Sequence, residues 1–234
     1  MTRNGESAVV VGAGPGLGTA LARAFAAEGF TVVAAARTPE PIQAPAGGGR
    51  IVPFACDATV PAEVERLFTA AENDHGPLHV AVFNAGVFER GHVVDTAPED
   101  FERCWRVGCF AGFLVGQAAA RRMLPRGAGT ILFTGATASL RGGAGFVNLA
   151  SPKFALRAVA QSMARELGPR GIHVAHVIVD GQIRSPRYEG LVAERGPDSL
   201  LEPDAIAAQY VALHRQHRSA WTHELDLRPW VEKF

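Results

Sequence analysis

The segment from Val9 to Gly18 constrains the fold of this chain more than any other part of it. Three consecutive valines predict a buried strand, and the glycines that follow let the backbone turn sharply. Leu17, Leu21 and Phe25 then repeat at helical spacing, so a helix begins directly after the turn. The N–H groups and the positive dipole end of that helix suit a pyrophosphate. We predict a nucleotide-binding turn, with an ordinary glycine-rich turn as the alternative, and assign its ligand contacts to Gly12, Gly14, Gly16, Leu17 and Gly18.

Strand and helix patterns alternate along the rest of the chain. After the strand at Val9–Val11, further strands are predicted at Thr31–Ala36, Ile51–Ala55, Leu78–Phe83, Thr130–Thr134, Ile172–Val179 and Glu224–Arg228. Helices are predicted from Pro61, from Pro98 to Met123, from Ser151 to Gly168 and from Asp204 to about His217. No repeat or break in composition marks a second domain. The sequence predicts one α/β domain over residues 1–234, with a doubly wound parallel sheet of about seven strands flanked by helices.

Two local patterns refine this prediction. The prolines and glycines between Thr38 and Arg50 argue against a helix in that crossover. Ser151 followed by Pro152 predicts an N-cap and a first helical residue, which places Lys153 in the first turn of its helix. A lysine there opposes the helix dipole, so we expect it to have a ligand partner, with a solvated lysine as the alternative.

Composition excludes several classes of function. The 23 basic and 23 acidic residues among 234 give no net charge, which predicts neither a nucleic-acid partner nor an anionic membrane. Cys56, Cys104 and Cys109 form no C-x-x-C pair and are typical of reduced thiols in a cytoplasmic protein. No apolar segment has the length of a membrane span or the position of a signal peptide.

The histidines do not predict a metal site. His173 and His176 are three apart on a strand and face opposite sides of it. His214 and His217 are expected to share a helical face, but no third ligand accompanies them. We therefore expect no bound metal.

Polar or small residues follow three of the predicted strands. Ala36 and Arg37 stand where an acidic residue would bind the adenosine ribose, so a 2′-phosphate is not repelled and a guanidinium is available for it. This favours NADP(H) over NAD(H), unless Arg37 is simply solvated. Asp57 accepts from an adenine amino group or caps the helix near Pro61. Asn84 can brace neighbouring strands, and Ala85 and Gly86 permit close approach of a ligand.

These motifs, together with the Lys153 helix, resemble the short-chain dehydrogenase/reductase family over essentially the whole chain, from Ala8 to about Leu227. Its glycine pattern G-x-x-x-G-x-G is matched by Gly12, Gly16 and Gly18. The resemblance implies a Rossmann-type fold, a nicotinamide nucleotide cofactor contacted also by Ile183, oxidoreductase activity on a small molecule, and a homodimer or homotetramer.

The active-site pattern of that family is incomplete here. The family uses a Tyr four residues before the Lys, and that position is Leu149. Its Ser falls on Ala136 and its supporting Asn on Gly108. Neither Tyr188 nor Tyr210 begins a Tyr-x-x-x-Lys motif. We expect an atypical site that lacks these groups.

Lys153 and Asp180 are the remaining candidates for catalysis. Asp180 stands where the family usually has Pro, and a partly buried carboxyl can transfer protons near neutrality; the alternative, which is favoured, is that Asp180 only organises the turn with Gly181. The segment 184–203 is expected to cover the site, and the tail 221–234, with Trp230 and Phe234, covers the site or a neighbouring subunit. We predict an NADP(H)-dependent oxidoreductase of atypical mechanism; the alternative is a cofactor-binding sensor or oligomer partner without catalysis.

Overall fold

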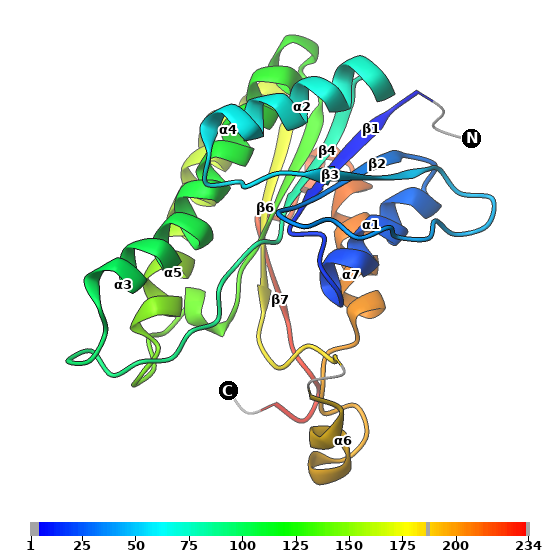
Figure 1. Ribbon diagram of the computed structural model, residues 1–234. Coiled ribbons are helices and arrows are strands. Elements are labelled where there is room, and N and C mark those ends of the chain that lie inside the picture. Colours follow the sequence, from blue (N-terminus) through cyan, green and yellow to red (C-terminus); the bar gives the residue numbers. More distant parts are fainter. Residues whose placement is uncertain (1–4, 186–187, 233–234) are drawn as a thin grey trace.

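The computed structural model describes residues 5–185 and 188–232, so Phe234 lies outside the described residues. They form one parallel sheet with the strand order β3-β2-β1-β4-β5-β6-β7 (Figure 1). The strands are β1 Ser7–Val11, β2 Thr31–Ala36, β3 Ile51–Ala55, β4 Leu78–Phe83, β5 Gly129–Thr134, β6 Ile172–Val179 and β7 Glu224–Leu227. The prediction of a doubly wound parallel sheet is confirmed.

Helices cover both faces of this sheet (Figure 1). One face carries α1 (Leu17–Ala27) and α7 (Pro203–His214), which pack against each other. The other face carries α2 (Pro61–His75), α4 (Ala111–Met123) and α5 (Val147–Leu167). The short helix α3 (Pro98–Trp105) leads into α4, and α6 (Glu189–Arg195) lies beyond the carboxyl edge of the sheet.

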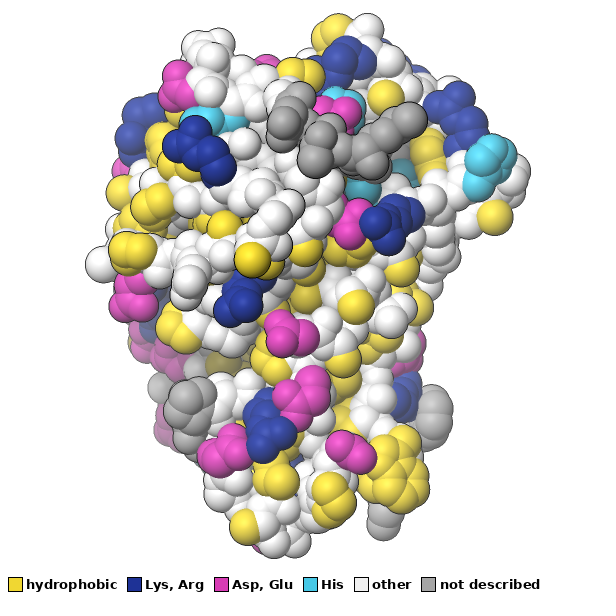
Figure 2. Space-filling view, turned by 90° about the vertical axis from the view of Figure 1, so that its right-hand side faces the viewer, with side chains coloured by type: hydrophobic (Ala, Val, Ile, Leu, Met, Phe, Trp, Pro, Cys, Tyr) yellow, Lys and Arg dark blue, Asp and Glu magenta, His cyan; other side chains and the backbone are white. Residues whose placement is uncertain are grey.

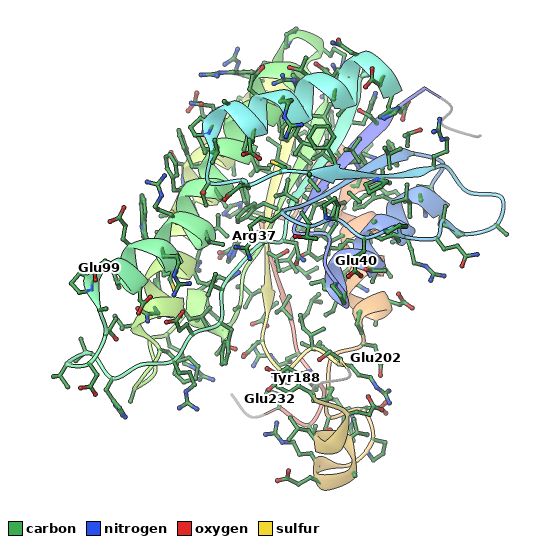
Figure 3. All side chains as sticks on the ribbon, in the orientation of Figure 1. Arg37, Glu40, Glu99, Tyr188, Glu202 and Glu232 are labelled. Atoms are coloured by element: carbon green, nitrogen blue, oxygen red, sulfur yellow. The ribbon has the colours of Figure 1, made fainter. Side chains whose placement is uncertain are left out.

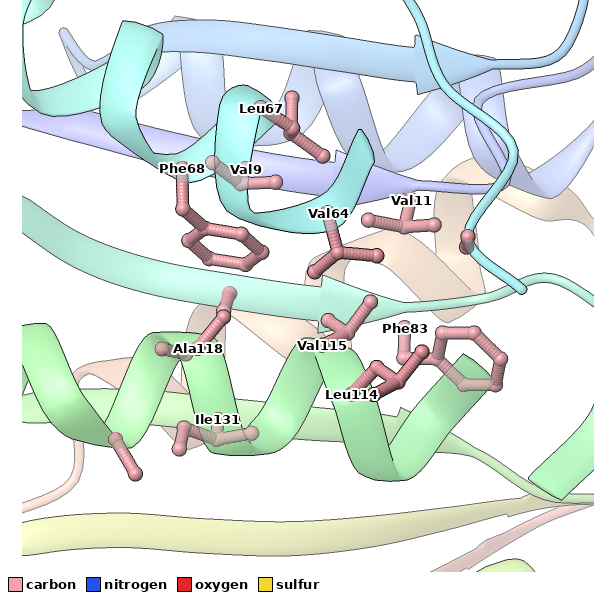
Figure 4. Packing of buried hydrophobic residues seen from close by; sticks show 14 of the residues in the cluster. Val9, Val11, Val64, Leu67, Phe68, Phe83, Leu114, Val115, Ala118 and Ile131 are labelled. Carbon is pink, nitrogen blue, oxygen red and sulfur yellow. The ribbon is translucent and has the colours of Figure 1, made fainter. Parts of the chain in front are cut away.

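The core consists of two apolar layers, one on each face of the sheet. Parallel strands with helices on both faces are buried on both sides, which is why β1, β4 and β6 consist almost entirely of apolar residues. Figure 4 shows part of one layer, in which Leu67 and Phe68 of α2 and Val115 of α4 pack over the strands. The crossover from Thr38 to Arg50 contains no helix, as its prolines and glycines predict.

The predicted start of α5 is wrong. The helix begins at Val147, not at Ser151, and Pro152 lies inside it. Ser151 is therefore not an N-cap, and Lys153 is in the second turn, where the expected conflict with the helix dipole is much weaker. Proline removes one backbone donor from the helix, but α5 continues through it to Leu167.

The predicted helix from Pro98 to Met123 is interrupted by a π-helical turn, Arg106–Phe110. Gly108, at the centre of this turn, lies directly against Pro152. A Cβ atom added to Gly108 would be 2.8 Å from the Cβ of Pro152, closer than such atoms approach in proteins. Glycine at 108 therefore makes room for the proline ring of α5.

The last helix, α7, ends at His214 and not near His217. His217 lies beyond it, where its ring accepts the backbone N–H of Ser219, so His214 and His217 do not share a helical face. Among the described residues no group of three or more His, Cys, Asp or Glu side chains is arranged to bind a metal ion.

The surface carries charges of both signs. On the face seen in Figure 2, basic and acidic side chains lie interspersed with apolar ones. Phe101 and Trp105 of α3, Phe113 of α4 and Phe154 of α5 are large apolar side chains that remain about two-fifths exposed. Within residues 5–185 and 188–232, none of the helices combines the length and apolar character that a membrane crossing requires.

Candidate active site

The turn after β1 can form only with glycine at three positions. Gly12 and Gly16 both have a φ of 89°, which favours glycine. A Cβ on Gly12 would lie 2.5 Å from the backbone nitrogen of Ala85, and one on Gly18 would lie 2.2 Å from the carbonyl oxygen of Gly12. A Cβ on Gly14 would have no neighbour within 4 Å, so packing does not require glycine at that position.

The N-terminus of α1 is open to a ligand. Gly16 precedes the helix, no side chain caps it, and no acidic residue occupies its first turn among the described residues. The first N–H groups of a helix have no partner within it, and an anion satisfies them. Asn84 supports the turn from the adjacent strand, because its Nδ2 donates to the carbonyl oxygen of Gly12 at 3.1 Å. The predicted bracing role of Asn84 is confirmed.

Two cavities flank this turn and share Gly12 and Asn84 in their walls. One, of about 620 Å³, is bounded by residues at the ends of β2, β3 and β4. The other, of about 750 Å³, lies between the turn, α5 and the segment after β6. The first contains Gly14, Arg37, Asp57, Ala85 and Gly86, and the second contains Gly16, Leu17, Gly18, Lys153 and Ile183. Every residue that the sequence assigned to cofactor binding therefore lines one or both cavities.

One carboxylate oxygen of Asp57 accepts hydrogen bonds from a neighbouring residue. Its Oδ1 accepts the N–H of Thr59 at 2.9 Å and the hydroxyl of Thr59 at 2.7 Å. These bonds lower the pKa of Asp57, and the nearby Arg37 lowers it further. The N-cap of α2 is Val60, so the predicted capping of α2 by Asp57 is wrong. Its place in the cavity wall leaves the adenine contact as a prediction.

Lys153 belongs to α5, and its side chain lines the larger cavity. Its side chain is 7% exposed, and its Nζ donates to the carbonyl oxygen of Thr134, at the end of β5, over 2.7 Å. Burial lowers the pKa of Lys153 to about 8, because the charged form loses its hydration. A Cβ on Gly86 would lie 3.7 Å from this nitrogen, so the amine sits between the ends of β4 and β5.

Asp180 is engaged by the protein itself. Its Oδ1 accepts the hydroxyl of Thr137, and its Oδ2 lies 3.4 Å from a guanidinium nitrogen of Arg228. Its backbone N–H donates to Leu227, which ties the end of β6 to β7. Asp180 lines neither of the two cavities. The geometry corresponds to the second of its two predicted roles, organisation of the turn.

The positions that the sequence resemblance assigns to a catalytic Tyr and Ser have apolar side chains. These residues, Leu149 and Ala136, both line the larger cavity, as Phe88 and Phe146 do. Phe88 and Phe146 contact each other edge to face, with ring centroids 6.0 Å apart. This wall of the cavity therefore presents hydrocarbon to a bound molecule.

A buried polar cluster supports the loop that carries Ala136. His176 of β6 is fully buried, with Nε2 3.4 Å from the hydroxyl of Ser139 and Nδ1 3.5 Å from Glu224. Burial lowers the pKa of His176 to about 4, so the ring is neutral at physiological pH. A Cβ on Gly135 would lie 2.4 Å from its Nε2, so glycine is required there. Sequence reasoning considered His176 only as a metal ligand and missed this role.

Sequence reasoning also missed Tyr188 and Arg141, which both line the larger cavity. Figure 3 places Tyr188 beyond the carboxyl edge of the sheet, toward α6, and Arg37 nearer the sheet. A search for Tyr-x-x-x-Lys could not find Tyr188, because the residue four positions later is Val192.

Residues 6–192 match the family model described as short chain dehydrogenase. The chain belongs to the short-chain dehydrogenase family. It is 33% identical over 178 residues to the 3-oxoacyl-(acyl-carrier-protein) reductase MabA of Mycobacterium avium, which covers 76% of this chain and 67% of that relative. The crystal structure of a short-chain dehydrogenase from Rhodopseudomonas palustris is 44% identical, with a TM-score of 0.83, over 97% of this chain and 99% of that one.

A third relative bears on the cofactor. The crystal structure of a metagenomic short-chain oxidoreductase in complex with NADP is 28% identical, with a TM-score of 0.83, over 97% of this chain and 99% of that one. Short-chain dehydrogenases are oxidoreductases that bind a nucleotide cofactor and act on small molecules. The two cavities beside the glycine turn are therefore the candidate cofactor and substrate site of this family member.

Proposed function

We propose that this short-chain dehydrogenase is an NADP(H)-dependent oxidoreductase that moves hydride to or from a small organic substrate. The observation that supports this best is the pair of cavities on either side of the glycine turn, which share Gly12 and Asn84. Such a pair of cavities accommodates a dinucleotide whose pyrophosphate crosses the N-terminus of α1. The smaller cavity then holds the adenosine end, and the larger one holds the nicotinamide and the substrate.

The preference for NADP(H) rests on Arg37 and Ala36. Both line the smaller cavity, and the position directly after β2 is held by Arg37 and not by an acidic residue that would repel a 2′-phosphate. A guanidinium binds a phosphate through two parallel hydrogen bonds. A relative in this family was crystallised in complex with NADP.

A nicotinamide in this site would supply or accept a hydride. Lys153 would hold the adjacent ribose, because its Nζ has donors to spare beyond the bond to Thr134. With its pKa lowered to about 8, Lys153 can also exchange a proton near neutral pH. We assign no proton transfer to Asp180, because Thr137 and Arg228 engage its carboxylate.

We further propose that the chain forms a homodimer or homotetramer and works in the cytoplasm. The exposed apolar side chains Phe101, Trp105, Phe113 and Phe154 belong to the connected helices α3 and α4 and to α5. Grouped exposed apolar side chains are typical of an interface between subunits. The free thiols Cys56, Cys104 and Cys109 are compatible with a reducing compartment.

A second candidate function is cofactor binding without catalysis. The apolar side chains of Leu149 and Ala136 favour it, because they supply no proton to a substrate. Reduction of carbonyl probes with NADPH, followed by the loss of absorbance at 340 nm, separates the two functions. A protein that binds NADPH but reduces no probe is a sensor or an oligomer partner.

Fluorescence titration of NADPH and NADH tests the cofactor assignment. We expect NADPH to bind more tightly than NADH. Arg37→Ala should weaken NADPH binding by about 10- to 100-fold, which corresponds to about 1.5–3 kcal/mol for a charge-assisted contact. The affinity for NADH should change little in this variant. Arg50→Ala is the matched control, because Arg50 is exposed at the opposite end of β3. Equal affinities for the two nucleotides, or an unchanged NADPH affinity in Arg37→Ala, would remove the argument.

A further inference from the structure

Few of the described side chains that line the larger cavity can transfer a proton to a substrate. Leu149, Ala136, Phe88 and Phe146 make one wall apolar. Arginine stays protonated at all relevant pH values and gives no proton. Among the described residues that line this cavity, Lys153 and one tyrosine are the side chains that can give up a proton and regain it.

That tyrosine, Tyr188, comes from a different part of the chain than α5. It follows β6 and directly precedes α6, whereas Lys153 comes from α5. Tyr188 is half-buried and lines the same cavity as Leu149 and Lys153. Figure 3 places it beyond the carboxyl edge of the sheet. A substrate in this cavity would therefore meet both the apolar side chain of Leu149 and the phenol of Tyr188.

The segment that carries Tyr188 is held by a defined set of contacts. Arg184 donates to Glu189, the residue after Tyr188, at 2.7 Å and to Glu202 at 2.6 Å. The backbone N–H of Arg184 donates to Leu201 at 2.9 Å, and Leu201 donates to Gln182 at 2.8 Å. One arginine thus connects the first turn of α6 to the residue before α7. These contacts hold the residues on both sides of Tyr188, which lines the cavity.

We propose that Tyr188 is the proton donor of this site, a phenol supplied by the segment after β6 instead of by α5. The inference rests on the proposed function, in which a nicotinamide nucleotide supplies the hydride. Reduction of a carbonyl group to an alcohol adds one hydride to carbon and one proton to oxygen. The O–H bond of Tyr188 breaks as its proton passes to the substrate oxygen, and the phenolate then takes a proton from water.

Tyr188→Phe tests this role with the apolar ring retained. The probes are benzil, camphorquinone and 4-nitrobenzaldehyde, with NADPH as the reductant. We expect kcat to fall about 100-fold or more, the usual contribution of a positioned acid, while the dissociation constant for NADPH stays within about twofold. A double variant, Tyr188→Phe with Leu149→Tyr, restores a phenol one helical turn before Lys153 and should recover at least about tenfold of the lost kcat.

Chemical modification of the tyrosines tests the position of Tyr188 without measuring turnover. The chain has two tyrosines, and Tyr210 is fully buried against Thr134. Tetranitromethane should therefore nitrate Tyr188 alone, as read by peptide mass spectrometry. Saturating NADP⁺ with benzil should slow the nitration at least about fivefold, because both occupy the cavity that Tyr188 lines.

The outcomes separate the inference from the proposed function. If the parent protein reduces a probe and Tyr188→Phe reduces it equally fast, the role of Tyr188 is overturned and the proposed function stands. Nitration that NADP⁺ and benzil leave unchanged also overturns it. A parent protein that reduces no probe overturns the proposed function, and the role of Tyr188 with it.

Discussion

Lys153→Met tests the burial of the Lys153 ammonium through the pH dependence of stability. Burial lowers the pKa of Lys153 from 10.5 to about 8. Between these values the unfolded chain binds more protons than the folded chain, so the free energy of unfolding rises with pH across this window. Below about pH 8 the buried charge lowers the free energy of unfolding by about 3 kcal/mol, since each pKa unit corresponds to about 1.4 kcal/mol.

Methionine has a similar length and no charge, so the variant lacks this pH-dependent contribution. It also leaves the carbonyl oxygen of Thr134 without its donor, a loss of about 1–3 kcal/mol that does not depend on pH. The stability of the variant relative to the parent should therefore fall by about 2–3 kcal/mol from about pH 7 to about pH 10. The presence of this slope distinguishes a buried amine from a solvated one, which gives no difference with pH.

Urea denaturation followed by circular dichroism, at several pH values in that range, measures this difference. Leu149→Met is the control, because it changes a neutral side chain one turn away on α5 and should give a difference that is constant with pH. If the curves of Lys153→Met and the parent are parallel, Lys153 is hydrated in solution and its pKa is not lowered. The ribose contact and the proton exchange assigned to it would then lose their physical basis.

Two further predictions concern packing. Gly108→Ala places a Cβ 2.8 Å from that of Pro152, so we expect a loss of about 1–3 kcal/mol in the free energy of unfolding. Adding Pro152→Gly, which removes that second Cβ, should recover most of it, as a denaturant double-mutant cycle can measure. Light scattering should give a multiple of the 24.7 kDa chain mass, and Trp105→Glu with Phe154→Glu should reduce it to that of one chain. A parent protein of about 25 kDa at micromolar concentration would contradict the second prediction.

The strands could be predicted from the sequence because each is a short apolar run bounded by turn residues. All seven were located, and β2, β3, β4 and β6 have the predicted boundaries. The start of α5 could not be obtained in this way, because Ser151-Pro152 is a strong local start signal. The proline is accommodated inside α5 beside Gly108, a residue far away in the sequence, and a local signal cannot report such a contact.

That the residues assigned to the cofactor line two adjoining cavities was also predictable. Most of them follow consecutive parallel strands, and the ends of such strands meet at one edge of a sheet. The place of Tyr188 in the larger cavity was not, because Tyr188 belongs to no strand or sequence motif and its position depends on the fold around it. Asp180 was attractive from its position alone, but a charge on Arg228 and a hydroxyl on Thr137 engage it.

Lys153 and the glycine turn share a property that links fold to function. Gly12 and Gly16 hold backbone conformations that other residues rarely adopt, and Lys153 carries a buried charge that lowers stability below about pH 8. All three border the same pair of cavities. A desolvated charge beside a cavity is typical of a binding site, since a ligand can compensate for the lost hydration. We propose that an anionic dinucleotide does so here: its phosphates would accept the first N–H groups of α1, and its ribose hydroxyls would replace the hydration that Lys153 has lost.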